Sequence, residues 1–358
     1  MTVITKLRRF GEHQNAFGFL RLLFASLVIV SHTIEVNDGH ARREPLTRLF
    51  GTITFGQFAV AGFFLISGFL ITASYLKSPS PADYIRKRVT RIYPGFIVCS
   101  VICMVALGPL GGGDAPVGVK HAVIAPVIRA LILCPPIMDN VFLGSHYAHL
   151  NGAAWTIQYE LLCYIVVLIL GTLRMINKPS IVIALSAICL VSTSVAPQGI
   201  SDLLNSLPLG SLVFQGDRIA ILRLIGLFLA GSSFYLIQNV IPISKVAAAT
   251  CAVLLCGTLA YQSLAYLGLA VFGSYLIFSV AAFGTGTVLE KINNKNDISY
   301  GLYLYAWPIG LLLLWWRVSS SLWIVGGLTV FLASAAGAAS WFIVEKPAMK
   351  WGRPGSSS

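Results

Sequence analysis

The sequence predicts an all-α fold, a polytopic membrane bundle of about ten transmembrane helices. Of its 358 residues, 56% are hydrophobic and only 11% are charged, and the mean hydropathy is +0.81, far above the balance of a soluble domain. Apolar runs long enough to cross a hydrocarbon core of ~30 Å recur along the whole chain. We therefore expect residues 1–345 to form a single integral-membrane domain and residues 346–358 to form a short cytoplasmic tail.

The first expected helix, 16–36, follows the basic stretch KLRR at 6–9, as the apolar part of a signal peptide does. Its apolar part runs for about 20 residues and ends at His32 and Glu35 instead of a small-residue cleavage site, so we expect a retained transmembrane helix. The other expected helices follow at 51–76, 92–109, 154–176, 180–196, 218–237, 246–262, 264–286, 298–316 and 322–344.

Lysines and arginines are distributed unevenly between the two sets of loops. With the N-terminus inside, most of them fall on the cytoplasmic side, among them the cluster YIRKRVTRIYP at 84–94 in the first cytoplasmic loop. The Lys/Arg excess therefore predicts that both termini are cytoplasmic. The same short clusters account for the net charge of +12, so we expect no nucleic-acid partner.

Several classes of chemistry have no support in the sequence. The seven cysteines lie mostly in apolar runs without CxxC spacing, which predicts free buried thiols and neither a metal site nor a disulfide framework. There is also no Walker loop, no GxGxxG after a strand, no GxSxG elbow and no HExxH. An ATPase, a serine hydrolase and a metalloprotease are therefore not supported.

Two ionisable side chains, Arg21 and His32, lie within the first expected helix. Their spacing places both on one helix face, roughly 16 Å apart along the axis. Because buried charge in lipid costs several kcal/mol, this face is expected to line a polar interior. A guanidinium and an imidazole at different depths indicate the handling of an anionic substrate and a proton.

Glu160 lies near the outer start of the fourth expected helix, at a depth similar to that of His32 near the outer end of the first. A carboxylate bonded to one imidazole nitrogen would fix the tautomer and leave the other nitrogen to accept a proton from a hydroxyl. The alternative is a buried His–Glu pair that only satisfies its own hydrogen bonds.

Arg86, Arg88 and Arg91 belong to the basic cluster of the first cytoplasmic loop, and Arg21 lies nearer that side of the membrane than His32. Together these arginines are suited to a phosphate-rich ligand. The alternative for the loop cluster is a topology signal or a contact with lipid phosphates.

Two further segments carry weaker signals. GFFLISGFL at 62–70 contains Ser67 between small residues, which fits either a helix-packing face or a ligand contact. SYGLYLYAWP at 299–308 contains Tyr300, Tyr303 and a tryptophan, which fit either an interfacial aromatic belt or hydroxyls presented to a sugar.

Five segments, in this order, resemble the membrane-bound acyltransferase family 3 of bacterial O-acyltransferases. They are Arg21-x10-His32, FFLISGFL at 63–70, RVTRIYP at 88–94, WTIQYE at 155–160 and SYGLYLYAWP at 299–308. Each is loose alone, but the ordered set spans the chain from the first expected helix to the ninth and is fairly specific.

The resemblance implies an enzyme that transfers an acyl group, commonly acetyl, from cytoplasmic acyl-CoA to a hydroxyl of an extracytoplasmic carbohydrate. The standalone type, which this chain resembles, is associated with acylation of exopolysaccharides, O-antigens and secreted oligosaccharides, and sometimes of small molecules, so the resemblance leaves the acceptor open. It also implies a multi-pass protein of the bacterial inner (plasma) membrane, with acyl-CoA, the acceptor and the bilayer as partners and no permanently bound cofactor. The sequence does not indicate an oligomeric state.

On that resemblance, Arg21 and His32 match the family's Arg-x10-His motif, Arg88 and Arg91 match its RxxR motif, and Glu160 matches its WSLxxE carboxylate. Two positions depart from the pattern. WTI stands where WSL is common, and Ala306 occupies a position often held by His in YLYHWP, so no role of that His is transferred to this chain.

The resulting hypothesis has the CoA phosphates against the arginines of the 84–94 cluster and the pantetheine arm passing Arg21 toward His32. There His32, oriented by Glu160, deprotonates the acceptor hydroxyl; a covalent acyl-His intermediate is the alternative. Ser67 is expected among the donor contacts. The residues expected to bind the carbohydrate are Trp155, Tyr300 and Tyr303. The competing hypotheses are a proton-coupled transporter or flippase of a glycolipid, and a non-catalytic scaffold.

Overall fold

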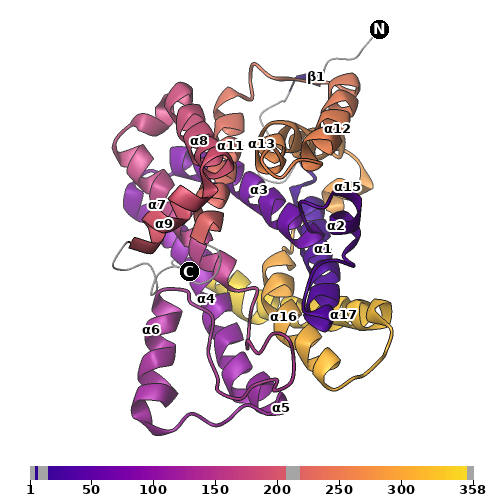
Figure 1. Cartoon of the computed structure of the whole chain (residues 1–358). Coiled ribbons are helices and arrows are strands. Elements are labelled where there is room, and N and C mark those ends of the chain that lie inside the picture. The colour runs from indigo at the N-terminus through magenta and orange to yellow at the C-terminus, as the bar shows by residue number, and fades with distance from the viewer. Residues whose placement is uncertain (1–4, 7–14, 207–217, 353–358) are drawn as a thin grey trace. The chain divides into compact units, whose positions relative to one another are not determined.

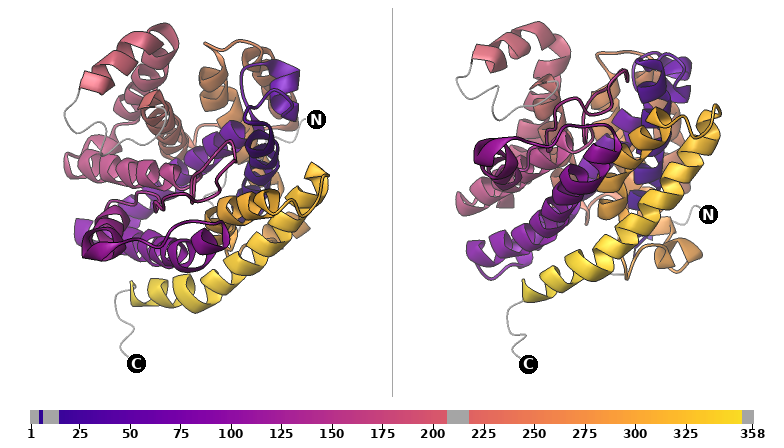
Figure 2. Two further views of the ribbon diagram at one scale, coloured as in Figure 1. Left: turned by 60° about the horizontal axis from the view of Figure 1, so that its bottom comes forward. Right: turned by 90° about the horizontal axis from the view of Figure 1, so that it is seen from below.

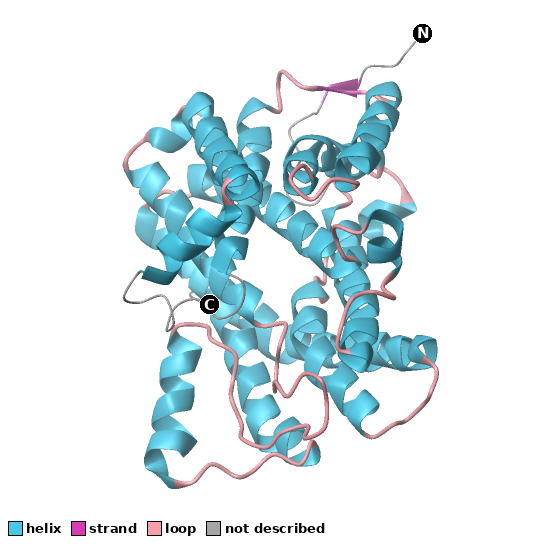
Figure 3. Cartoon of the chain, viewed as in Figure 1, coloured by secondary structure: helices cyan, strands magenta, loops and turns pink. Residues whose placement is uncertain are grey.

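The computed structural model describes residues 5–6, 15–206 and 218–352, and this part of the chain is predominantly helical, with loops between the helices (Figure 3). Its strands are β1, Thr5–Lys6, and β2, Pro242–Ile243, which pair antiparallel. Helices suit an apolar chain because they satisfy every backbone hydrogen bond within the segment, where lipid offers none. The predicted all-α class is confirmed.

The chain divides into two compact units. Unit 1 comprises residues 1–24, 46–81 and 159–295, and unit 2 comprises residues 25–45, 82–158 and 296–358. Helices α1, Phe17–Asp38, and α7, Trp155–Thr172, contribute residues to both units.

Unit 1 is organised around α11, Arg218–Ile237, which packs against α3, Phe55–Lys77, and α8, Pro179–Val195 (Figure 1). The α3–α11 contact is a backbone-to-backbone approach, since a Cβ added at Gly68 would lie 1.8 Å from the carbonyl oxygen of Phe228. This supports the helix-packing interpretation of GFFLISGFL. The other helices of unit 1 are α9 (Pro197–Ser206), α12 (Lys245–Leu259), α13 (Ala265–Gly268), η4 (Leu269–Gly273), α14 (Ser274–Phe283), α15 (Val288–Lys291) and the short η3 (Met175–Asn177).

Unit 2 contains α16, Ser299–Trp315, with α17, Leu322–Ser340, alongside it (Figure 2). A Cβ at Gly337 would lie 2.6 Å from the backbone nitrogen of Leu302, so the two backbones are in contact. Helix α17 continues through η5 (Trp341–Glu345) and α18 (Lys346–Trp351). The other helices are α4 (Pro81–Ile102), η1 (Cys103–Leu107), α5 (Gly108–Leu110), η2 (Lys120–Ile124), α6 (Ala125–Leu131) and α2 (Pro45–Phe50), which begins in unit 2 and continues into unit 1.

Residues 84–94, expected to connect two helices, are themselves helical and belong to α4. The expected boundary between loop and helix is therefore wrong, whereas the cytoplasmic position of the cluster remains a prediction. Helix α4 begins at Pro81, and proline suits a first helical turn, where its missing N–H costs nothing. Asp83 in that turn pairs with Arg86 and Lys87, three and four residues further on. These start signals extend the helix about three turns before the apolar run that predicted it.

Each of the ten expected ranges contains a helix, but fewer helices are long and apolar enough to cross a membrane. Within the described residues there are seven, or up to eight if α8 and α9, bent by 105°, form one span. The count of about ten crossings, the single domain and the cytoplasmic termini therefore remain predictions. Of the expected tail, 346–358, residues 353–358 lie outside the described part.

Candidate functional site

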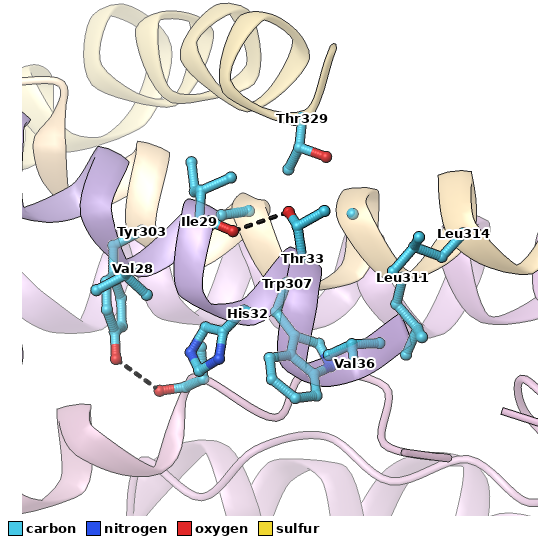
Figure 4. Close-up of a pocket in the computed structure, with 13 residues that line it drawn as sticks. Val28, Ile29, His32, Thr33, Val36, Tyr303, Trp307, Leu311, Leu314 and Thr329 are labelled. Carbon is cyan, nitrogen blue, oxygen red and sulfur yellow. Dashed lines mark hydrogen bonds between the residues drawn. The ribbon is translucent and has the colours of Figure 1, made fainter. Parts of the chain in front are cut away.

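A small pocket lies beside His32 in unit 2 (Figure 4). Its cavity volume is ≈ 20 Å³, room for about one water molecule. Helix α1 lines it with residues at positions 28, 29, 32, 33 and 36, and α16 lines it with residues at positions 303, 306, 307, 310, 311 and 314. Spacings of three and four residues put each set on a single helix face, so the pocket follows from two apolar stripes that meet. Ala153 and Thr329 complete the wall.

His32 has a carboxylate neighbour on its own helix. Its Nδ1 lies 3.5 Å from Oε2 of Glu35, one turn further along α1. The Nδ1 atom is buried and makes no hydrogen bond within the described residues. The two atoms are therefore within ion-pair distance but do not form a hydrogen bond. The other carboxylate oxygen of Glu35 accepts a hydrogen bond of 3.4 Å from the hydroxyl of Tyr147. Burial, together with the charge of Glu35, raises the pKa of Tyr147, which keeps the phenol protonated as a donor.

Trp307 forms the other side of the His32 environment. Its indole meets the imidazole edge-on, with ring centroids 4.9 Å apart. The indole N–H donates to the carbonyl of His149, and a Cβ at Gly152 would lie 2.4 Å from the ring, so the indole packs directly on backbone. The connection before α7 thus supplies both the partner of Glu35 and the anchor of Trp307.

The three residues expected to bind carbohydrate take different positions in unit 2. Tyr303 lines the pocket, and its hydroxyl hydrogen-bonds Thr156 and the carbonyl of Ala153. Tyr300 donates to the carbonyl of Ile92. Trp155 is the first residue of α7 and is half-buried. Their role toward an acceptor remains a prediction.

The three arginines expected to bind the donor all lie on α4, but their surroundings differ. Arg86 pairs with Asp83 near the start of the helix, and the guanidinium of Arg88 lies 5.9 Å from the ring centroid of Tyr84.

Arg91 is surrounded by two carboxylates and two aromatic rings. Its guanidinium lies 2.9 Å from Asp297 and 3.2 Å from Glu345, and the side chain of Glu345 is fully buried. The rings of Tyr300 and Trp341 lie 5.5 and 5.6 Å from the same guanidinium. Arg91 therefore joins α4 to the start of α16 and to η5, which is a structural role that the sequence motif did not predict.

In unit 1, the structure brings together two predicted site residues from helices far apart in the chain. Glu160 on α7 accepts hydrogen bonds from Ser67 on α3, at 3.0 Å, and from Tyr164 one turn further along α7, at 2.7 Å. Arg21 is half-buried on the part of α1 that belongs to this unit. The predicted pairing of Glu160 with His32 remains a prediction, and the carboxylate beside His32 within unit 2 is Glu35.

Sequence reasoning missed Glu35 and Tyr147. A spacing of three residues on a helix places Glu35 on the same face as His32, so that signal was present. Tyr147 lies in an irregular connection, where no periodicity indicates what a side chain will meet. Within the described part of the chain, no group of three or more His, Cys, Asp or Glu side chains is arranged to hold a metal ion.

Comparison with known proteins yields a family and two relatives. A family model described as an acyltransferase domain matches residues 14–344. The chain is 26% identical to an O-acetyl transferase of Shigella phage Sf6 over 297 residues, which cover 82% of this chain and 84% of the relative. It is 28% identical to Nodulation protein 10 of Rhizobium leguminosarum bv. viciae over 369 aligned positions, covering 94% of each. No solved structure matches the chain.

Proposed function

The chain belongs to acyltransferase family 3, as its five ordered motifs predicted, and from this membership we propose that it transfers an acetyl group from acyl-CoA to a hydroxyl of a carbohydrate acceptor. A relative covering most of the chain is an O-acetyl transferase, which supports acetyl as the group and oxygen as the acceptor atom.

The observation that carries this proposal is the position of the His32 imidazole, in the wall of a pocket formed mainly by apolar side chains. Its Nδ1 faces Glu35, which leaves Nε2 to act on a substrate. In the proposed reaction, Nε2 accepts the hydroxyl proton while the acceptor oxygen attacks the thioester carbonyl. The C–S bond then breaks, and the imidazolium returns its proton to the departing CoA sulfur.

In a two-step route the imidazole itself attacks the thioester carbonyl, the C–S bond breaks and CoA leaves as a thiolate, so that the acyl group is carried on His32. The acceptor hydroxyl then attacks this acyl group, the N–acyl bond breaks, and the hydroxyl proton balances the charge of the released thiolate. The two routes differ when no acceptor is present. Labelled acyl groups trapped on His32 after a single turnover without acceptor support the two-step route, and their absence supports direct attack.

The donor is proposed to enter from the cytoplasmic side with its phosphates near the arginines of α4 and its pantetheine arm directed toward Arg21. Guanidinium groups suit this task because they bind phosphate oxygens in a bidentate fashion. This part of the proposal rests on the match to the Arg-x10-His and RxxR motifs and on the basic character of α4.

The test is a reconstitution of the purified protein in liposomes with labelled acetyl-CoA and a surface glycan extract as acceptor. We expect label in the glycan and an equal amount of released CoA, both dependent on the protein. The proposal is overturned if acetyl-CoA is not consumed with any glycan while a glycolipid crosses the bilayer, because that result identifies a transporter.

A further inference from the structure

The carboxylate of Glu35 lies next to Nδ1 of His32, the imidazole nitrogen that is not expected to act on the substrate. It lies one turn from His32 on α1, with Oε2 at 3.5 Å from Nδ1, and its side chain is about a third exposed, at 30%. Its second oxygen, Oε1, is the one that accepts from Tyr147. The carboxylate therefore has one oxygen directed at the imidazole and the other held by a neutral donor.

We propose that Glu35 is the positioning residue of His32 and that Tyr147 holds Glu35 in place for this task. The inference rests on the proposed function and deepens it, because it assigns the carboxylate partner of the base within unit 2. Neither the motif match nor the relatives assign a role to Glu35 or Tyr147.

The physical argument begins with the tautomer of the imidazole. A neutral imidazole that accepts a proton at Nε2 must carry its own hydrogen on Nδ1. A carboxylate facing Nδ1 favours that tautomer, and it stabilises the positive charge that appears on the ring when Nε2 accepts the hydroxyl proton. The 3.5 Å separation is longer than a hydrogen bond, as is common for catalytic contacts without substrate, and shortening it needs only a side-chain movement.

The alternative is an ordinary helix-surface pair with no role in the reaction. Such a pair stabilises a helix only weakly, and it needs no third residue. Here a hydroxyl from a connection more than a hundred residues away meets the second oxygen of Glu35. The same connection anchors Trp307 against the other side of the imidazole. The ring is thus held from two directions by groups that fix its orientation.

Glu35→Gln is the central variant, because it keeps the shape of the side chain and removes its charge. We expect kcat to fall about 10- to 100-fold, the range found when the outer partner of a metal-bound imidazole is removed. The KM for acetyl-CoA should stay within about twofold, since Glu35 contacts the base and not the donor. Glu35→Asp should recover part of the lost kcat by restoring a carboxylate, which a merely structural role does not predict.

Asp38→Asn is the matched control, since it makes the same type of change one turn further along α1. The carboxylate of Asp38 pairs with Arg43 and Asn37 instead of His32, so kcat should match that of the unchanged protein. Tyr147→Phe removes only the donor to Glu35, and we expect kcat to fall about three- to tenfold at unchanged KM.

The outcomes separate this inference from the proposed function. If the unchanged protein acetylates its acceptor and His32→Ala does not, while folded Glu35→Gln keeps full kcat, the positioning role is wrong and the function stands. If Glu35→Gln does not fold, Tyr147→Phe decides, and a wild-type kcat in that variant overturns the inference. An unchanged protein without any transferase activity overturns the proposed function itself.

Discussion

The indole of Trp307 meets the imidazole of His32 edge-on, with ring planes at 79°. An edge-to-face contact of this kind restricts rotation of the smaller ring, because the positive edge of one ring faces the π-system of the other. The hydrogen bond from the indole to the carbonyl of His149 fixes the tryptophan in turn. Trp307 is thus a wall of the pocket and an orienting contact for the base.

Substitution of Trp307 should therefore affect turnover more than donor binding. Trp307→Phe keeps a ring but loses the N–H bond to His149, and we expect kcat to fall a few-fold. Trp307→Ala also removes the ring contact and should lower kcat by about tenfold or more. Steady-state kinetics on both variants measure this, and equal activity of Trp307→Ala and the unchanged protein would contradict the orienting role.

The close approach of α3 and α11 makes Gly68 a sensitive position for stability. A Cβ at Gly68 would lie 1.8 Å from a backbone oxygen of α11, and backbone yields less easily than a side chain. Gly68→Ala should lower the free energy of unfolding by at least about 1–3 kcal/mol. The thermal unfolding midpoint in detergent is the measurement.

The control for Gly68 lies in the same unit. A Cβ at Gly257 in α12 meets nothing within 4 Å, so Gly257→Ala should leave the midpoint unchanged or raise it through better helix propensity. Equal midpoints for the two alanine variants would show that α3 and α11 are not in backbone contact.

Arg91 should contribute to the stability of the fold as well as to the proposed binding of the donor. Arg91→Ala leaves the fully buried Glu345 without the guanidinium that lies 3.2 Å away, and loss of one member of a buried pair typically costs about 3–5 kcal/mol. Arg86→Ala should be much milder, because Lys87 still pairs with Asp83. Thermal unfolding of both variants tests the contrast, and an unaltered midpoint in Arg91→Ala would place the residue outside the packing of unit 2.

Arg21 is predicted to bind the donor rather than to support the fold. Arg21→Lys keeps the charge but loses the planar fork that pairs with phosphate oxygens. We expect a raised KM for acetyl-CoA with little change in kcat. A fall in kcat at constant KM would instead indicate that Arg21 acts in the transition state.

The sequence predicted the helices well where the signal was a long apolar run, because the length and apolar character of such a run are enough to indicate a membrane helix. It misplaced the start of α4, because Pro81 and Asp83 begin the helix about three turns before its continuous apolar run. The contact between Glu35 and His32 could have been predicted from their three-residue spacing on one helix. The contact of Tyr147 with Glu35 could not have been predicted, because the side chains of an irregular connection are positioned only by tertiary packing.

The contact between Glu160 and Ser67 shows a second limit of prediction from sequence motifs. Both residues were singled out separately, the first as a carboxylate for His32 and the second as a donor contact. They lie 93 positions apart, and only the packing of α7 and α3 brings them to 3.0 Å. Motifs indicate which residues matter, whereas partners across helices follow from the fold.

Acetyl transfer by His32→Ala is the most direct test of the central claim. The measurement compares label transferred from acetyl-CoA to the glycan by reconstituted wild type, His32→Ala and the exposed control His121→Ala at equal protein abundance. The account predicts a loss of about 100-fold or more in His32→Ala and no loss in the control. Wild-type transfer by folded His32→Ala would contradict it.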